Sequence, residues 1–156
     1  MKKVLLSFIM AGFAMAASAQ TLKDEFQYIQ EIWGKEKKTL VNEAIKLNGE
    51  EANKFWPLYD EYQVERQNFG KKRLEAIKLY ADNFETMTDA KAQEITKMVL
   101  DNNLGLDKLQ AKYYKKMVKA VGAIKATQFL QLESYIDAQL KAAISDAIPF
   151  FPDPKK

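Results

Sequence analysis

The chain of 156 residues is 47% hydrophobic and 29% charged, a balance that excludes an intrinsically disordered protein and suits one folded domain. It has no cysteine and no histidine, which excludes disulfides, thiolate nucleophiles, imidazole bases and the usual zinc, copper and haem ligands. The formal net charge of +3 is small and gives no sign of a nucleic-acid partner. We therefore expect no catalytic residue, no metal and no cofactor, and predict that the protein is not an enzyme.

Residues 1–19 have the features of a secretory signal peptide. Two lysines supply the charged start, residues 4–16 are mostly apolar, and Ala17, Ser18 and Ala19 form a small-residue cleavage site. The alternative is an uncleaved membrane anchor, but about 13 mostly apolar residues fall short of the roughly 20 that span a bilayer. We predict cleavage after Ala19 and a periplasmic location.

Residues 20–148 are predicted to form a single helical domain, because apolar residues recur at steps of three or four almost throughout. The first helix is expected from about residue 22 to residue 47. Its apolar stripe consists of Leu22, Phe26, Ile29, Trp33, Leu40, Ala44 and Leu47.

A second helix is expected from about residue 49 to residue 85. Asn48 and Glu51 have the spacing of a capping box, in which each side chain accepts a hydrogen bond from the other residue's free backbone N–H. Pro57 is expected to kink this helix near its start. The face predicted to be buried consists of Ala52, Phe55, Tyr59, Tyr62, Phe69, Ile77, Tyr80 and Phe84.

A third helix is expected from about residue 89 to residue 121, with Thr88 as its N-cap and Gly122 as its stop. Only a few residues join it to the second helix, so two helices of about 50 Å each must form a long antiparallel hairpin. A fourth helix is expected over about residues 124–147, ended by Pro149. The predicted fold is all-α, with four helices in an elongated bundle or cradle.

The third helix carries two apolar faces and a basic edge. The first face is an ordinary core stripe of Ile95, Val99, Asn102, Leu106, Leu109, Tyr113, Met117 and Ala120. The opposite face, which we call the apolar strip, consists of Leu100, Leu104, Ala111, Tyr114 and Val118. Between them runs the lysine edge, which consists of Lys97, Lys108, Lys112, Lys115, Lys116 and Lys119.

Each of these two surfaces has an ordinary explanation and a functional one. The apolar strip is either covered by another helix of the same chain, or exposed as a dimer seam or a surface for apolar segments of other proteins. The lysine edge is either a solvated helix face, or a surface that attracts acidic, partly unfolded chains or anionic lipid head groups.

Other candidate sites have simpler explanations. Glu61 and Glu65 lie one helical turn apart and could reach a hard cation, but a solvated helix face accounts for them. The mature chain has only Ser134 and Ser145 as serines, and without an imidazole they are not expected to act as nucleophiles. Core packing is also the expected role of the aromatic residues Phe55, Trp56, Tyr59 and Tyr62.

The tail of residues 149–156 contains three prolines and cannot continue a helix. The two apolar phenylalanine side chains of this tail are expected to be buried against other residues. The tail is expected to fold back over the end of the bundle, and the alternative is a docking peptide for a partner.

Two of the helix starts carry a family resemblance. The segments Leu47–Glu51 and Met87–Lys91 lie forty positions apart and resemble the repeated Leu-Thr-x-x-Gln signature of Spy/CpxP-like periplasmic proteins. Asn48 and Glu51 are chemically fair substitutes for the Thr and Gln of that signature, whereas Lys91 departs from it. The segments Phe55–Tyr62 and Phe129–Glu133 also look like parts of related exported helical proteins.

This resemblance covers about residues 40–148 and implies a cradle of long helices that is often dimeric. It also implies either chaperone activity without nucleotide or inhibition of an envelope-stress sensor. The expected function is therefore a periplasmic holdase in the envelope stress response, with a regulatory partner of a membrane sensor as the alternative. The expected partners are unfolded or stressed envelope proteins or that sensor, and a second copy in a homodimer.

Overall fold

The computed structural model describes residues 36–152, and among these the residues up to Leu40 belong to a different unit from those that begin at Val41. The predicted signal peptide and most of the predicted first helix lie outside the described residues. Within residues 36–152 the secondary structure is helical, without any strand, which confirms the all-α prediction. Across the same residues, no helix has the length and apolar character needed to cross a membrane. A helix covers residues 36–45.

The next helix, α2, spans Gly49–Asn83. Its predicted capping box is confirmed: the Glu51 N–H donates to Asn48 Oδ1 at 2.9 Å, and the Asn48 N–H donates to Glu51 Oε2 at 2.9 Å. The helix continues through Pro57. It ends two residues earlier than expected, because the chain tightens into a short 3-10 turn, η2, over Phe84–Thr86.

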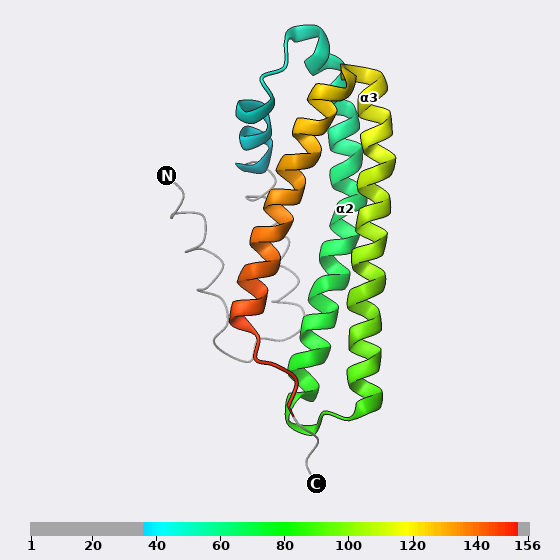
Figure 1. Cartoon of the computed structure of the whole chain (residues 1–156), viewed down its shortest axis with the longest axis vertical. Helices are drawn as coiled ribbons and strands as arrows, with labels where there is room; N and C mark the ends of the chain where they lie inside the picture. The colour runs from blue at the N-terminus through cyan, green and yellow to red at the C-terminus, as the bar shows by residue number, and fades with distance from the viewer. Residues whose placement is uncertain (1–35, 153–156) are drawn as a thin grey trace. The chain divides into compact units, whose positions relative to one another are not determined.

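The remaining helix, α3, spans Asp89–Ala147 and begins at the predicted N-cap, where the Lys91 N–H donates to Thr88 Oγ1 at 3.3 Å. Two helices meet within α3 at Gly122, the residue at which the third helix is predicted to stop, so the break is confirmed, whereas the count of four separate helices is not. Gly122 has a φ of 81°, which glycine adopts without a Cβ clash, so one residue interrupts the helix and no loop is needed. Figure 1 shows that the chain reverses its direction there.

We call residues 89–121 the first arm of α3 and residues 123–147 its second arm. The first arm lies antiparallel to α2, since Glu61 contacts Lys116 and Glu65 contacts Lys112. The second arm lies parallel to α2, because the earlier α2 residue Tyr62 contacts Glu133 and the later α2 residue Arg73 contacts Asp137 (Figure 1). α2 therefore contacts both arms.

The core lies where α2, both arms and the end of the helix of residues 36–45 meet. Its aromatic rings pack mostly edge to face, with the Tyr62 ring 5.4 Å from Tyr113 and 5.3 Å from Phe129. The expected core roles of Phe55, Tyr59 and Tyr62 are confirmed, because all three are buried. The buried cluster consists of Val41, Ile45, Phe55, Tyr59, Tyr62, Leu106, Leu109, Tyr113, Met117, Ala126 and Phe129.

The tail after α3 is tied to α2 by Tyr80. The Tyr80 hydroxyl donates to the Pro149 carbonyl oxygen at 2.6 Å, and the Phe151 ring lies edge-on to the Tyr80 ring at 4.9 Å. Phe151 therefore packs back onto the helices, whereas Phe150 remains 97% exposed.

Candidate functional site

The apolar strip is divided into an exposed and a half-buried part. Leu100 and Leu104 are 62% and 54% exposed, and Ala111 is exposed beside them. Tyr114 and Val118 are half-buried and pack against the core, because the second arm lies next to the first arm near Gly122. The strip expected as one continuous surface is thus reduced to Leu100, Leu104 and Ala111, which we call the exposed strip.

Three of the six lysines of the lysine edge form ion pairs with acidic residues. Lys97 pairs with Asp101 on the same arm. The ammonium groups of Lys112 and Lys116 reach across to Glu65 and Glu61 of α2, and both also lie over the Tyr113 ring. Within the described part of the chain, no ion pair is formed by the other three lysines, which are Lys108, Lys115 and Lys119.

The carboxylates of Glu61 and Glu65 on α2 are held by Lys116 and Lys112. Lys112 Nζ lies 2.8 and 2.9 Å from the two carboxylate oxygens of Glu65, and the Tyr113 hydroxyl donates to Glu65 Oε1 at 2.7 Å. The hydrogen bond from Lys112, and then that from Tyr113, lowers the pKa of Glu65 below its ordinary value. Burial, together with the Glu65 carboxylate, raises the pKa of Tyr113. Both groups therefore keep their charge states across the neutral range.

A basic groove lies between α2 and the first arm. It has a volume of about 410 Å³, enough for a few side chains, and is lined by Lys72, Lys108 and Lys112 together with Glu65. Its floor depends on Gly105, because a Cβ there would lie 2.5 Å from Cε1 of Phe69. Lys108 lines this groove, and the exposed Ala111 follows it by three residues on the same arm.

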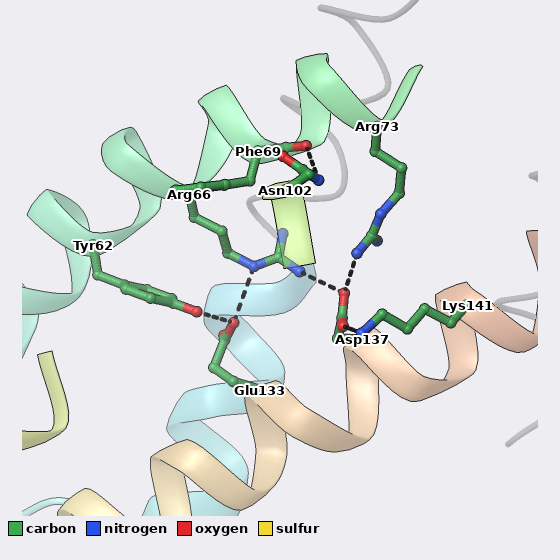
Figure 2. A network of polar contacts seen from close by, with 8 residues as sticks. All are labelled: Tyr62, Arg66, Phe69, Arg73, Asn102, Glu133, Asp137 and Lys141. Carbon is green, nitrogen blue, oxygen red and sulfur yellow. Dashed lines mark hydrogen bonds and ion pairs between the residues drawn. The ribbon is translucent and has the colours of Figure 1, made fainter. Parts of the chain in front are cut away.

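A second polar assembly, which the sequence analysis did not predict, joins α2 to the second arm (Figure 2). Glu133 is fully buried and accepts a hydrogen bond from the Tyr62 hydroxyl at 2.9 Å. Arg66 Nε lies 3.2 Å from Glu133 Oε2, and Arg73 donates to Asp137 Oδ1 at 2.8 Å. We call this assembly the buried ion cluster, and its members are Arg66, Arg73, Glu133, Asp137 and Lys141.

The buried ion cluster fixes how the second arm packs against α2. Burial opposes ionisation of Asp137, but hydrogen bonds from Lys141 and Arg73 outweigh it and hold the pKa of Asp137 below its ordinary value. A buried charge without its partner is costly, so the pairs favour one register of the second arm against α2. The sequence signal was present: Glu133 and Asp137 directly follow the core positions Leu132 and Ile136.

Comparison with known proteins adds no relative. No family model, no curated protein and no solved structure matches this chain.

Proposed function

We propose that the protein is an exported helical binding protein of the Spy/CpxP-like kind, a periplasmic holdase that acts without nucleotide. Unfolded or stressed envelope proteins bind to the first arm of α3 and are kept from aggregating. The observation that carries the proposal is the exposed strip, where Leu100 and Leu104 lie one helical turn apart in water. Contiguous exposed apolar side chains are a common mark of a protein-binding surface.

The charges around the exposed strip support the same function. Lys108, Lys115 and Lys119 lie on the same arm and form no ion pair with the described residues. Free cations beside an apolar surface accelerate encounter with acidic, partly unfolded chains, and the acceleration falls as salt rises.

The arrangement of α2 and the first arm suits a passive holdase. Two long antiparallel helices, packed through buried residues such as Leu106 and Leu109, give a stiff platform that needs no conformational step to present its surface. In this proposal the chain is an elongated bundle or cradle, and it requires neither cofactor nor catalytic residue.

An aggregation assay tests the proposal. The purified mature protein is expected to suppress aggregation of an unfolding client at near-stoichiometric ratio. The double variant Leu100→Ser and Leu104→Ser is expected to lose most of this suppression with an unchanged melting temperature. Ile124→Ser is the matched control, because Ile124 is 76% exposed elsewhere on α3. Absence of suppression at any ratio, or equal losses in both variants, contradicts the proposal.

The alternative is a regulatory protein that binds one membrane stress sensor, and Phe150 is the observation that favours it. A single, almost fully exposed aromatic side chain on a tail fixed by Tyr80 suits one specific pocket in a partner. In this case, deletion of the gene activates stress genes, and Phe150→Ala has the same effect although client holding in vitro is unchanged.

A further inference from the structure

The basic groove between α2 and the first arm carries positive charge that its own walls do not neutralise. Its charged lining residues are Lys72, Lys108, Lys112 and Glu65, a net charge of +2. The carboxylate of Glu65 is already engaged, because Lys112 contacts both of its oxygens and the Tyr113 hydroxyl contacts one of them. Lys72 and Lys108 form no ion pair with any residue of 36–152. Two cations, one from each helix, therefore share this groove without an anion from the described chain.

The groove also holds its polar groups around a floor that has little side chain of its own. The Lys72 ammonium lies over the Phe69 ring, 5.9 Å from its centroid, which keeps this charge above the floor. Gly105 leaves the space between the helices open, because a Cβ there would lie 2.5 Å from Cε1 of Phe69. Asn68 lines the groove one helical turn before Lys72, and its side-chain amide makes no hydrogen bond with residues 36–152. Three donor groups thus surround one open floor.

The number of donors and their charge indicate the chemistry of the ligand. An ammonium group has three hydrogens to donate and accepts none, and a side-chain amide has two. A phosphate monoester carries a charge of about −1.5 to −2 near pH 7 and has three strong acceptor oxygens. A carboxylate carries a single negative charge and has two oxygens. The phosphate therefore matches the groove better, both in charge and in the number of acceptors.

We propose that the basic groove binds the phosphate group of a phosphate monoester, held by Lys72, Lys108 and the amide of Asn68. The phosphate lies between α2 and the first arm above Gly105. The residue before Gly105 is Leu104, which is 54% exposed, so the organic part of the ester leaves the groove near an apolar side chain. This binding site does not depend on chaperone activity, and its test contains no client protein.

Titration with inorganic phosphate tests the site, followed by the amide chemical shifts of the purified protein. Sodium chloride holds the ionic strength constant, so that general screening of charge does not change during the titration. We expect saturable shifts at Asn68 and Gly105 with a dissociation constant on the order of 1 mM, because exposed lysines gain little from each contact. Acetate is expected to bind about tenfold more weakly, since it offers one charge and two oxygens.

Two double variants remove the same charge from different places. Lys72→Gln with Lys108→Gln is expected to weaken phosphate binding about tenfold or more. Lys115→Gln with Lys119→Gln, on the first arm but outside the lining of the groove, is the matched control and is expected to stay within about twofold of the wild type. Asn68→Asp places a carboxylate beside the two lysines and is also expected to abolish binding.

Three results would overturn the proposal: no saturable shift at constant ionic strength, acetate binding as tight as that of phosphate, or equal weakening in both double variants. Glycerol 3-phosphate and phosphatidylcholine vesicles with phosphatidic acid then identify the source of the ester. Vesicle retention that Lys72→Gln with Lys108→Gln weakens more than the control does assigns a lipid. Binding of glycerol 3-phosphate without such retention assigns a soluble ester, and failure of both esters overturns the proposal.

Discussion

Tyr62 of α2 donates its hydroxyl hydrogen to the fully buried carboxylate of Glu133, 71 residues further along the chain. The same carboxylate oxygen lies 3.2 Å from Nε of Arg66. One buried oxygen therefore joins α2 to the second arm twice, through a neutral donor and through a cation.

Glu133→Gln is expected to destabilise the fold, because it removes the negative charge opposite the largely buried Arg66. Breaking one partner of a buried ion pair costs about 3 kcal/mol or more. Urea unfolding followed by circular dichroism measures the loss. Glu75→Gln, an exposed position on α2, is the control and is expected to stay within about 0.5 kcal/mol of the wild type. Equal stability of both variants contradicts the role of the buried ion cluster.

Asp137 makes stability depend on pH in the acid range. Its pKa in the folded protein lies below its ordinary value, so its contribution is present above the pKa of an unfolded aspartate, near 4, and is lost as pH falls through the lowered value. We expect the wild type to lose stability steeply below about pH 4. Asp137→Asn is less stable at pH 7 and has a shallower acid limb, which urea midpoints from pH 7 to pH 2.5 would show. Parallel curves for the two proteins would refute this assignment.

Gly105→Ala is expected to destabilise the contact between α2 and the first arm. The new Cβ would lie 2.5 Å from Phe69 Cε1, and overpacking of this kind costs about 1–3 kcal/mol. The gain in helix propensity of about 1 kcal/mol opposes this cost only in part. Gly49→Ala is the control, since its Cβ meets nothing within 4 Å. If Gly105→Ala is as stable as that control, the close approach of Phe69 is not what requires glycine at this position.

The three lysines of the first arm that form no ion pair with any residue of 36–152 are expected to control the rate of client association rather than the residence time of the complex. Replacing Lys108, Lys115 and Lys119 by Gln lowers the rate of binding to an acidic unfolded client and flattens its dependence on salt. Stopped-flow fluorescence at several ionic strengths measures both effects. The control is Lys78→Gln, because Lys78 is exposed and paired with Asp82 on α2. An unchanged salt dependence in the triple variant would mean that these lysines do not steer the client.

Features set by neighbouring residues were predictable from the sequence. In the caps at Asn48 and Thr88 the side chain accepts a hydrogen bond from the backbone N–H three residues further on, and both caps are present as expected. The core stripe of the first arm was mostly right, because its spacing alone decides which residues share a face, although Val99 lies partly exposed.

Features set by distant segments were not predictable in the same way. Whether Tyr114 and Val118 are covered depends on how closely the second arm follows the first. The burial of Glu133 depends on Arg66 and Tyr62, which reach it only in the folded state. Helical spacing alone places an acidic residue such as Glu133 at the edge of its apolar stripe. It cannot show that a cation from another helix, here Arg66, will reach that residue.

Gly122 alone connects the two arms of α3, without a longer loop between them. A residue inserted in the helix directly after Gly122 would turn the rest of the second arm by about 100° around its own axis if the break at Gly122 keeps its geometry. That rotation would carry Glu133 and Asp137 away from their arginines and press glutamines toward the aromatic rings. The side of the second arm that faces α2 thus depends on the number of residues that follow Gly122. We therefore expect insertions and deletions at this point to be tolerated less well than in a connecting loop.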